Sequence, residues 1–207
     1  SLDWKSRGLD FLQDPSLTPL KAQLAYYSRV LEWAESLSRA YPHLREGLAW
    51  LKAHQPPERE PSLSWGDAKM GNCVFEGRRL AAMLDWEQAT LADGVDDLAW
   101  WLMLDECLSA GTGATRLPGL PTREATIARW EAAAGRRAEN LQYYEVFAAW
   151  RMACIMARIG TLFTARGWVP AEMQMDVNNG GATLLARHGQ RLGFWRTASQ
   201  VDADTLR

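Results

Sequence analysis

The stretch "LSWGDAKMGNCVFEGRRLAAMLDWEQATLADGVDDLAWW", from Leu63 to Trp101, decides how this chain folds. Its first two thirds consist of short apolar segments, and a turn at Glu76-Gly77 separates two of them. Such segments are typical of small strands. We therefore expect a strand at "SLSW" and a hairpin formed by Cys73–Phe75 and Leu80–Leu84.

Most of the remaining chain shows helical spacing of its apolar residues, which resumes after Asp93-Gly94 in "VDDLAWWLMLDECL". The segment "SAGTGATRLPGLP" is expected to be a loop; its glycines do not indicate a phosphate-binding loop, because no strand precedes them and no Gly-Lys-Ser/Thr follows. The predicted fold is mainly α with a small central β-hairpin, in a single domain over residues 1–207. The other predicted helices are Leu20–Ala40, His43–His54, Thr122–Ala134, Ala138–Arg166 and Met173–Leu192, the last with a possible break near Asn178 to Gly181.

Composition excludes several classes of function. The formal net charge is −2 and no run of five basic residues occurs, which argues against nucleic acid as a partner. The three cysteines form no C-x-x-C pair, so neither a zinc site nor a disulfide framework is indicated. No apolar run approaches the roughly 18 residues of a membrane span and no signal peptide is recognisable, so we expect a cytoplasmic protein with no membrane partner.

Three oxygen-bearing side chains follow one another in an order that suits phosphoryl transfer. Asn72 lies five residues after Asp67, and Asp85 lies eighteen residues after it, beyond the predicted hairpin. Transfer of phosphate to an alcohol needs a carboxylate near the acceptor hydroxyl and oxygen ligands for Mg²⁺. Gly66 and Gly71 would permit the tight backbone that such a loop needs.

The motif "WGDAKMGNCVFEGRRLAAMLDWEQATLADGVDDLAWW" resembles the catalytic segment of the aminoglycoside phosphotransferase family, whose pattern is roughly HGD-x-x-x-x-N, a hairpin, [LI]-D-[WF]-E and GD-x-x-x-DLA. The combination is specific, and the likeness extends more weakly over most of the chain. It implies a protein-kinase-like (α+β) fold, Mg²⁺ and ATP or GTP as cofactors, and a small hydroxylated molecule as the substrate. The site would occupy residues 62–97.

The resemblance assigns roles to individual residues. It implies that Asp67 orients or deprotonates the acceptor hydroxyl and that Asn72 and Asp85 bind Mg²⁺ and, through it, the nucleotide. Asp97 would support the loop from the start of the following helix, where a carboxylate can accept backbone N–H groups. Each of these residues has an alternative role as a turn or helix cap, which Asp and Asn often fill.

Three further positions are less certain in role. Lys69 is a candidate catalytic cation, because a positive charge beside the transferred phosphate would stabilise the transition state; a solvated lysine is the alternative. Glu87 either contacts substrate or metal or faces solvent. Trp65 stands where the family has His, which removes a polar anchor and adds bulk.

A kinase-like enzyme also needs a lobe that grips the nucleotide. The 66 residues before Asp67 show no alternating strand pattern and no lysine-bearing strand of the V-A-I-K type. We therefore expect the chain to be the C-terminal lobe only, with an N-terminal lobe of the same polypeptide as its missing partner, and the start at Ser1 rather than Met favours a piece of a longer protein. Alone, this piece is expected to bind nucleotide weakly and to turn over poorly.

The sequence does not identify the molecule that accepts the phosphate. A polycation such as an aminoglycoside needs carboxylates, and the supply around the motif is modest. Aromatic residues near the motif either belong to the core or line a pocket for a less charged acceptor, such as a hydroxylated acyl chain or a drug-like alcohol. The carboxylates are Asp105, Glu106, Glu145 and Asp176, and the apolar residues are Trp86, Trp100, Trp101 and Met103.

The leading prediction is a lobe of a small-molecule kinase that phosphorylates a hydroxyl. The alternative is a pseudo-enzyme or small-molecule-binding module that keeps the lobe without catalysis. A protein kinase is disfavoured, because no A-P-E-like segment follows Asp85 and "DWE" stands where D-F-G would.

Overall fold

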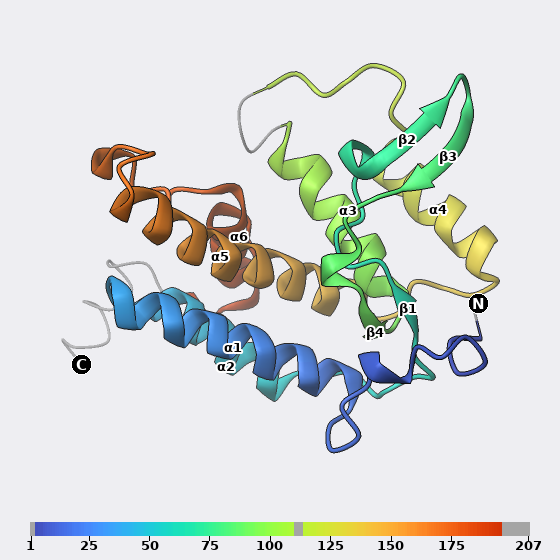
Figure 1. Ribbon diagram of the computed structural model, residues 1–207, viewed down its shortest axis with the longest axis horizontal. Coiled ribbons are helices and arrows are strands. Elements are labelled where there is room, and N and C mark those ends of the chain that lie inside the picture. The colour runs from blue at the N-terminus through green and yellow to red at the C-terminus, as the bar shows by residue number, and fades with distance from the viewer. Residues whose placement is uncertain (1–2, 110–113, 196–207) are drawn as a thin grey trace. The chain divides into compact units, whose positions relative to one another are not determined.

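A computed structural model describes residues 3–109 and 114–195 of the chain (Figure 1). The residues group into two compact units. Unit 1 comprises residues 1–23 and 56–145, and unit 2 comprises residues 24–55 and 146–207. Parts of the predicted loop, with Gly111 and Gly113, and the tail beyond residue 195 lie outside the described residues.

Unit 1 contains two small antiparallel sheets. Strand β2 (Cys73–Glu76) pairs with β3 (Arg79–Met83) in the predicted hairpin, with Cys73 opposite Met83 (Figure 1). Strand β1 (Ser62–Ser64) pairs with β4 (Thr90–Ala92). Sequence reasoning missed β4, because three residues are too short to show an alternating pattern and their partner strand lies some 28 residues away.

Helix α3 (Val95–Cys107) follows β4, and α4 (Arg123–Ala134) comes after the loop that ends at Pro121. Most residues of α3 are buried, from Val95 to Cys107, so this helix forms the core beneath the sheets of unit 1. Helix α4 starts where predicted, because the Thr122 side chain accepts a hydrogen bond from the Ala125 backbone N–H. Short 3-10 turns, η1 (Asp10–Leu12), η2 (Met70–Asn72) and η3 (Trp86–Gln88), complete the unit.

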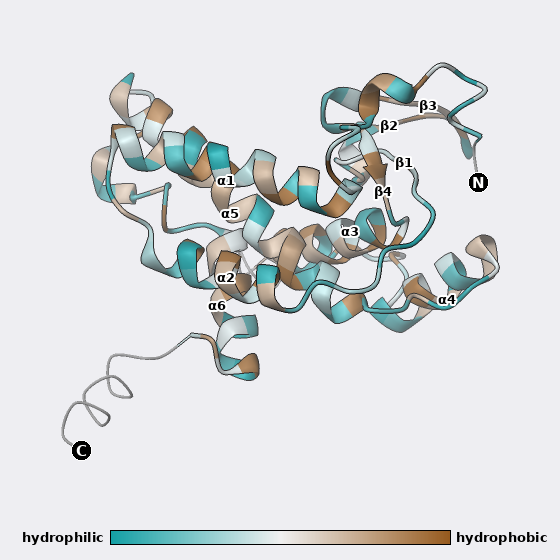
Figure 2. Ribbon diagram, turned by 90° about the horizontal axis from the view of Figure 1, so that it is seen from below, coloured by the Kyte–Doolittle hydropathy of each residue, from teal (hydrophilic) through white to brown (hydrophobic). Residues whose placement is uncertain are grey.

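Unit 2 is helical. It contains most of α1 (Pro19–Leu37) and of α5 (Leu141–Ala165), together with α2 (Pro42–Ala53) and α6 (Gly180–Leu192). Hydrophilic and hydrophobic residues alternate along α1, as expected for a helix with one buried face (Figure 2). The buried Trp150 donates its indole N–H to the Leu44 carbonyl at 2.8 Å and so joins α5 to α2.

Two sequence expectations need correction. The last helix begins at Gly180 and not at Met173, because Asn179 caps it by accepting the Ala182 N–H, and only the 3-10 turn η4 (Ala171–Met173) lies upstream. Among the described residues, α5 is long and apolar enough to cross a membrane by length and composition alone. In the structure 61% of that apolar window is buried, as in a core helix.

Candidate active site

The loop that carries Asp67, residues 65–72, is held by the carboxylate of Asp97 in the first turn of α3. One oxygen of Asp97 accepts the Gly66 N–H at 2.9 Å and the other accepts the Trp65 N–H at 2.8 Å. The Ser64 hydroxyl donates to the same carboxylate at 2.8 Å. Asp97 therefore makes the backbone contacts expected of a residue that supports this loop.

Only glycine fits at position 66. Gly66 has a φ of +84°, and a Cβ there would collide with the Gln88 carbonyl oxygen. The expectation for Gly71 is not met, because its φ is not positive and a Cβ at that position would meet no atom within 4 Å. The tight backbone therefore lies just before Asp67, and not after it.

The side chain of Asp67 is buried among hydrogen-bond donors. Lys69 Nζ lies 2.5 Å from Asp67 Oδ2, and the amide nitrogen of Asn72 donates to the same oxygen at 2.9 Å. The other oxygen, Oδ1, accepts the indole N–H of Trp100 at 3.0 Å. The residue as a whole is 8% exposed, so its carboxylate is solvated mainly by these three donors and little by water.

These contacts decide the charge of Asp67. Burial raises the pKa of its carboxyl, but hydrogen bonds from Lys69, Trp100 and Asn72 lower the pKa more, so that it falls below the ordinary 3.8. Asp67 is therefore ionised at neutral pH. A carboxylate with a lowered pKa is a weak base, but in its ionised form it can still accept a hydrogen bond from a hydroxyl.

Trp100 is the residue of this site that sequence reasoning did not identify. It was weighed as a core or pocket residue, and it is fully within the core, but its indole N–H also fixes one oxygen of the catalytic carboxylate candidate. The pattern contained a weak signal: Trp100 lies one turn along the helix from Asp97, on the face that Asp97 turns toward the loop.

Trp65 supplies a polar anchor of its own, contrary to the expectation that it removes one. Its indole N–H donates to the Leu84 carbonyl at 2.7 Å, and its ring lies 5.9 Å from the ring of Trp86. Leu84 directly precedes Asp85. The tryptophan thus ties the Asp67 loop to the end of the hairpin that carries the second aspartate.

Asn72 and Asp85 are brought together by the register of that hairpin. The Leu84 N–H donates to the Asn72 carbonyl at 2.8 Å, which sets Asp85 next to Asn72 along the strand pair. Asp85 adopts a left-handed conformation, with φ 55° and ψ 60°, which aspartate tolerates better than most residues. A residue held in this region is often found at a functional site.

The donor atoms at this place fit Mg²⁺. A carboxylate only accepts hydrogen bonds, so the Asn72 amide turns its nitrogen to Asp67 and its oxygen away, and that oxygen has no protein partner among the described residues. Asp85 is exposed and, within the same residues, makes no ion pair. Two oxygen ligands suit Mg²⁺, which is usually bound by one or two side chains plus phosphate and water.

Other acidic residues lie apart from this arrangement. Glu87 is exposed in η3, two residues beyond Asp85. Asp93 accepts the Val95 N–H and pairs with Arg136, which makes it a turn residue. Over residues 3–109 and 114–195 no group of three or more His, Cys, Asp or Glu side chains is placed to hold a metal ion unaided.

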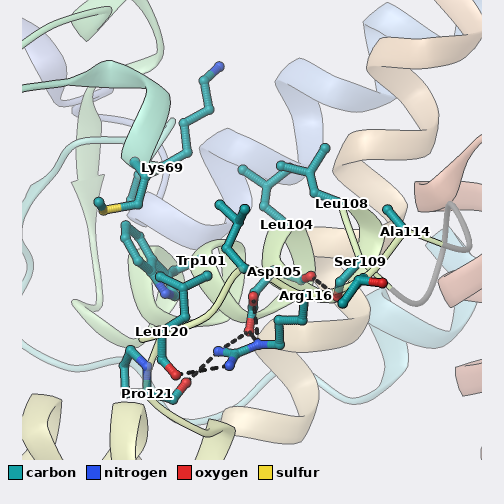
Figure 3. Close-up of a pocket in the computed structure, with 14 residues that line it drawn as sticks. Lys69, Trp101, Leu104, Asp105, Leu108, Ser109, Ala114, Arg116, Leu120 and Pro121 are labelled. Atoms are coloured by element: carbon teal, nitrogen blue, oxygen red, sulfur yellow. Dashed lines mark hydrogen bonds and ion pairs between the residues drawn. The ribbon is translucent and has the colours of Figure 1, made fainter.

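A pocket opens beside the Asp67 loop. Its cavity volume is about 340 Å³, and it lies between residues 68–70, α3 and the segment 114–121. Figure 3 shows Arg116 turned toward Asp105 and two backbone carbonyls, while Lys69 extends away from this pair. Trp101 lines the pocket, whereas Met103 is buried in the core and Trp86 is exposed.

We expect Asp97→Ala to destabilise the protein by about 3 kcal/mol, because it removes a charged acceptor and leaves the N–H groups of Trp65 and Gly66 unsatisfied. Urea unfolding monitored by circular dichroism measures the change. Glu124→Gln is the matched control, since this acidic residue also lies in the first turn of a helix but holds no loop. An equal loss of stability in both variants would contradict the role of Asp97.

The chain is similar in sequence and in fold to known proteins. Residues 1–150 match the family model described as "Phosphotransferase enzyme family". A solved structure of a "putative aminoglycoside phosphotransferase" from Ralstonia eutropha JMP134 superposes with a TM-score of 0.75 at 20% identity, over 92% of this chain and 60% of that one. This likeness confirms the predicted fold class, a mainly helical lobe of the kinase-like fold.

Two curated mammalian proteins are also similar to the chain. Mouse acyl-CoA dehydrogenase family member 10 is 29% identical over 161 residues, which are 70% of this chain and 15% of that protein. Rat acyl-CoA dehydrogenase family member 11 is 28% identical over 136 residues, which are 61% of this chain and 17% of that protein. The chain therefore spans less than a fifth of the length of these relatives.

Proposed function

The chain belongs to the phosphotransferase enzyme family, and on this premise we propose that it carries the catalytic part of a kinase that transfers phosphate from ATP or GTP to a hydroxyl of a small molecule. The observation that carries the proposal is the buried, ionised carboxylate of Asp67, which accepts a hydrogen bond from Asn72, while the Leu84 to Asn72 backbone bond brings the neighbouring Asp85 to the same end of the hairpin. These are the parts that phosphoryl transfer requires: a group for the nucleophile and a site for the metal-bound phosphates.

In this proposal, Asp67 orients the acceptor more than it deprotonates it. Its lowered pKa makes it a poor base for an alcohol in the ground state. The transition state of phosphoryl transfer is loose, so the proton need not leave early, and a carboxylate that aligns the hydroxyl suffices. Trp100 and Asn72 keep the carboxylate in one orientation for this task.

Asn72 and Asp85 would hold the Mg²⁺. A metal ion held there would supply positive charge against the negative charge of the transferring phosphate. The protein's own contribution is to fix both ligands on one hairpin, through the Leu84 to Asn72 backbone bond and the anchor of Trp65 on Leu84. Glu87 is not included among these ligands, because among the described residues it makes no hydrogen bond or ion pair with Asn72 or Asp67.

We further propose that residues outside this chain grip the base of the nucleotide. The strands of the described residues form two small two-stranded sheets, and the chain spans 60% of the structural neighbour. Activity is therefore best measured on the longest natural polypeptide that carries these 207 residues.

The proposal is tested by incubating that polypeptide with γ-labelled ATP or GTP, Mg²⁺ and a panel of alcohols. We expect labelled phosphate ester and nucleoside diphosphate in equal amounts for at least one class of alcohol. Binding of alcohols without transfer to any of them would instead support the alternative, a binding module without catalysis.

We expect Lys69→Met to raise the pKa of Asp67, because burial remains while the nearest positive charge is lost. In the native protein the pKa of Asp67 is lowered, so its ionised form adds stability above the unfolded pKa of about 3.9. This stability is lost as pH falls through the folded pKa. Because the ionised form of Asp67 is the active one, the raised pKa in Lys69→Met should move the acid limb of kcat/KM to higher pH. Lys52→Met, an exposed lysine at the end of α2, serves as the control, and an unmoved acid limb would contradict the pairing.

A further inference from the structure

Building on the proposed function, we propose that the acceptor is an alcohol with an apolar body that carries no positive charge, and that this body lies in the pocket between residues 68–70, α3 and residues 114–121. A linear aliphatic alcohol has this chemistry. The inference concerns the substrate class, which the family alone does not determine.

Apolar side chains make up most of the pocket wall. They come from the Asp67 loop, from successive turns of α3 and from the segment before α4. Burial of apolar surface would therefore supply the affinity, at about fourfold for each methylene group that enters. These side chains are Ala68, Met70, Trp101, Leu104, Leu108, Leu117, Leu120 and Pro121.

The charges of the pocket do not favour a polycation. Asp105 is the one acidic residue that the described lining contains, and Arg116 neutralises it through two nitrogens at 2.9 to 3.1 Å (Figure 3). Arg116 is in turn fixed by the carbonyls of Leu120 and Pro121. An ammonium group entering this pocket would lose its water without gaining an unpaired carboxylate.

The other three carboxylates considered for a cationic substrate lie outside the lining of this pocket. Glu106 is an exposed residue of α3. Glu145 pairs with Arg123, and Asp176 pairs with Arg39 at 2.8 Å and also accepts a hydrogen bond from Tyr41. Both are therefore already matched by protein cations. Lys69 also lines the pocket, and its ammonium group is already matched by the Asp67 carboxylate.

The position and size of the pocket set the geometry of the acceptor. Ala68 and Lys69, which directly follow Asp67, line the pocket. In this proposal the hydroxyl of a bound alcohol is directed toward the Asp67 carboxylate. At roughly 30 Å³ for each small group, 340 Å³ holds on the order of ten non-hydrogen atoms.

The test titrates this chain, without nucleotide, with linear alcohols from butan-1-ol to dodecan-1-ol, and follows the methyl signals of ¹³C-methionine by NMR. We expect the Met70 signal to shift, with affinity rising about fourfold per methylene and levelling off near ten carbons. The signal of Met173, an exposed methionine that does not line the pocket, should stay in place. Octan-1-ol should bind at least about tenfold more tightly than 8-aminooctan-1-ol or kanamycin.

Two leucine variants form a matched pair. Leu108 lies just past the end of α3 and lines the pocket, and Leu37 is the last residue of α1; they are 65% and 56% exposed. Leu108→Asp should weaken octan-1-ol binding at least about tenfold and reduce the preference over the amino alcohol, while Leu37→Asp should change neither. Tighter binding of the cations, absence of chain-length dependence, or an unmoved Met70 signal would overturn the inference.

This experiment separates the inference from the proposed function. Alcohols that bind as expected but accept no phosphate would count against the kinase activity alone. Phosphate transfer to a hydroxyl of a polycation such as kanamycin, with no binding of aliphatic alcohols, would count against the substrate class alone.

Discussion

Asp67→Asn should lower kcat/KM for phosphate transfer at least about a hundredfold, the usual scale for losing a positioned acid–base group. Asparagine has the same shape, so it keeps the loop folded and can still accept the Trp100 N–H. It loses the negative charge that aligns the acceptor hydroxyl, and it ends the ion pair with Lys69. The loss should therefore lie in kcat, with the affinity for metal-bound nucleotide little changed.

Steady-state kinetics on the longest natural polypeptide measures this effect, and thermal unfolding shows that the fold is kept. Asp10→Asn is the control, because this aspartate is exposed in η1 and carries the same change of charge. Near-normal turnover in Asp67→Asn would remove Asp67 from the mechanism.

Asp85→Ala has the second large expected effect, a loss of about a hundredfold or more in activity at ordinary Mg²⁺ concentrations. The reason differs from that for Asp67, since a metal ion contributes several kcal/mol of charge stabilisation and Asp85 would be its one charged protein ligand. Part of the activity should return at high Mg²⁺, because Asn72 still offers its oxygen. The dependence of rate on Mg²⁺ concentration is the measurement.

Glu76→Gln is the matched control for Asp85→Ala. Glu76 lies on the same hairpin, at the end of β2, and is exposed and paired with Arg79, away from Asn72. It should leave the Mg²⁺ dependence unchanged. A loss of activity in Asp85→Ala that is the same at all Mg²⁺ concentrations would argue against a metal-binding role.

The proximity of Asp67, Asn72 and Asp85 in the fold could be predicted, because these residues lie close together in the sequence. A loop followed by a short hairpin returns the chain to its starting point, so the sequence itself places Asp85 near Asn72. Local helical spacing likewise predicted the helix at residues 95–107, whereas the supporting role of Asp97 was implied by the family resemblance.

The remaining features depend on contacts between distant residues. The helical spacing of Trp100 from Asp97 gives only a weak signal for its contact with Asp67, and no local pattern indicates that Trp65 reaches the carbonyl of Leu84. The same is true of β4, because its partner strand β1 lies before the site residues in the sequence and β4 lies after them. The ion pair of Asp105 with Arg116, which makes the pocket neutral, likewise joins a helix to a loop without regular structure.

The proposed phosphate transfer requires one cation site, formed by Asn72 and Asp85 next to Asp67. Mn²⁺ suits the same oxygen ligands as Mg²⁺, and its electron paramagnetic resonance signal reports the fraction bound. In a titration of the longest natural polypeptide with Mn²⁺ and ATP, we expect one bound ion per chain in the native protein and in Asp67→Asn, and a loss of binding in Asp85→Ala. Undiminished Mn²⁺–ATP binding in Asp85→Ala would contradict it.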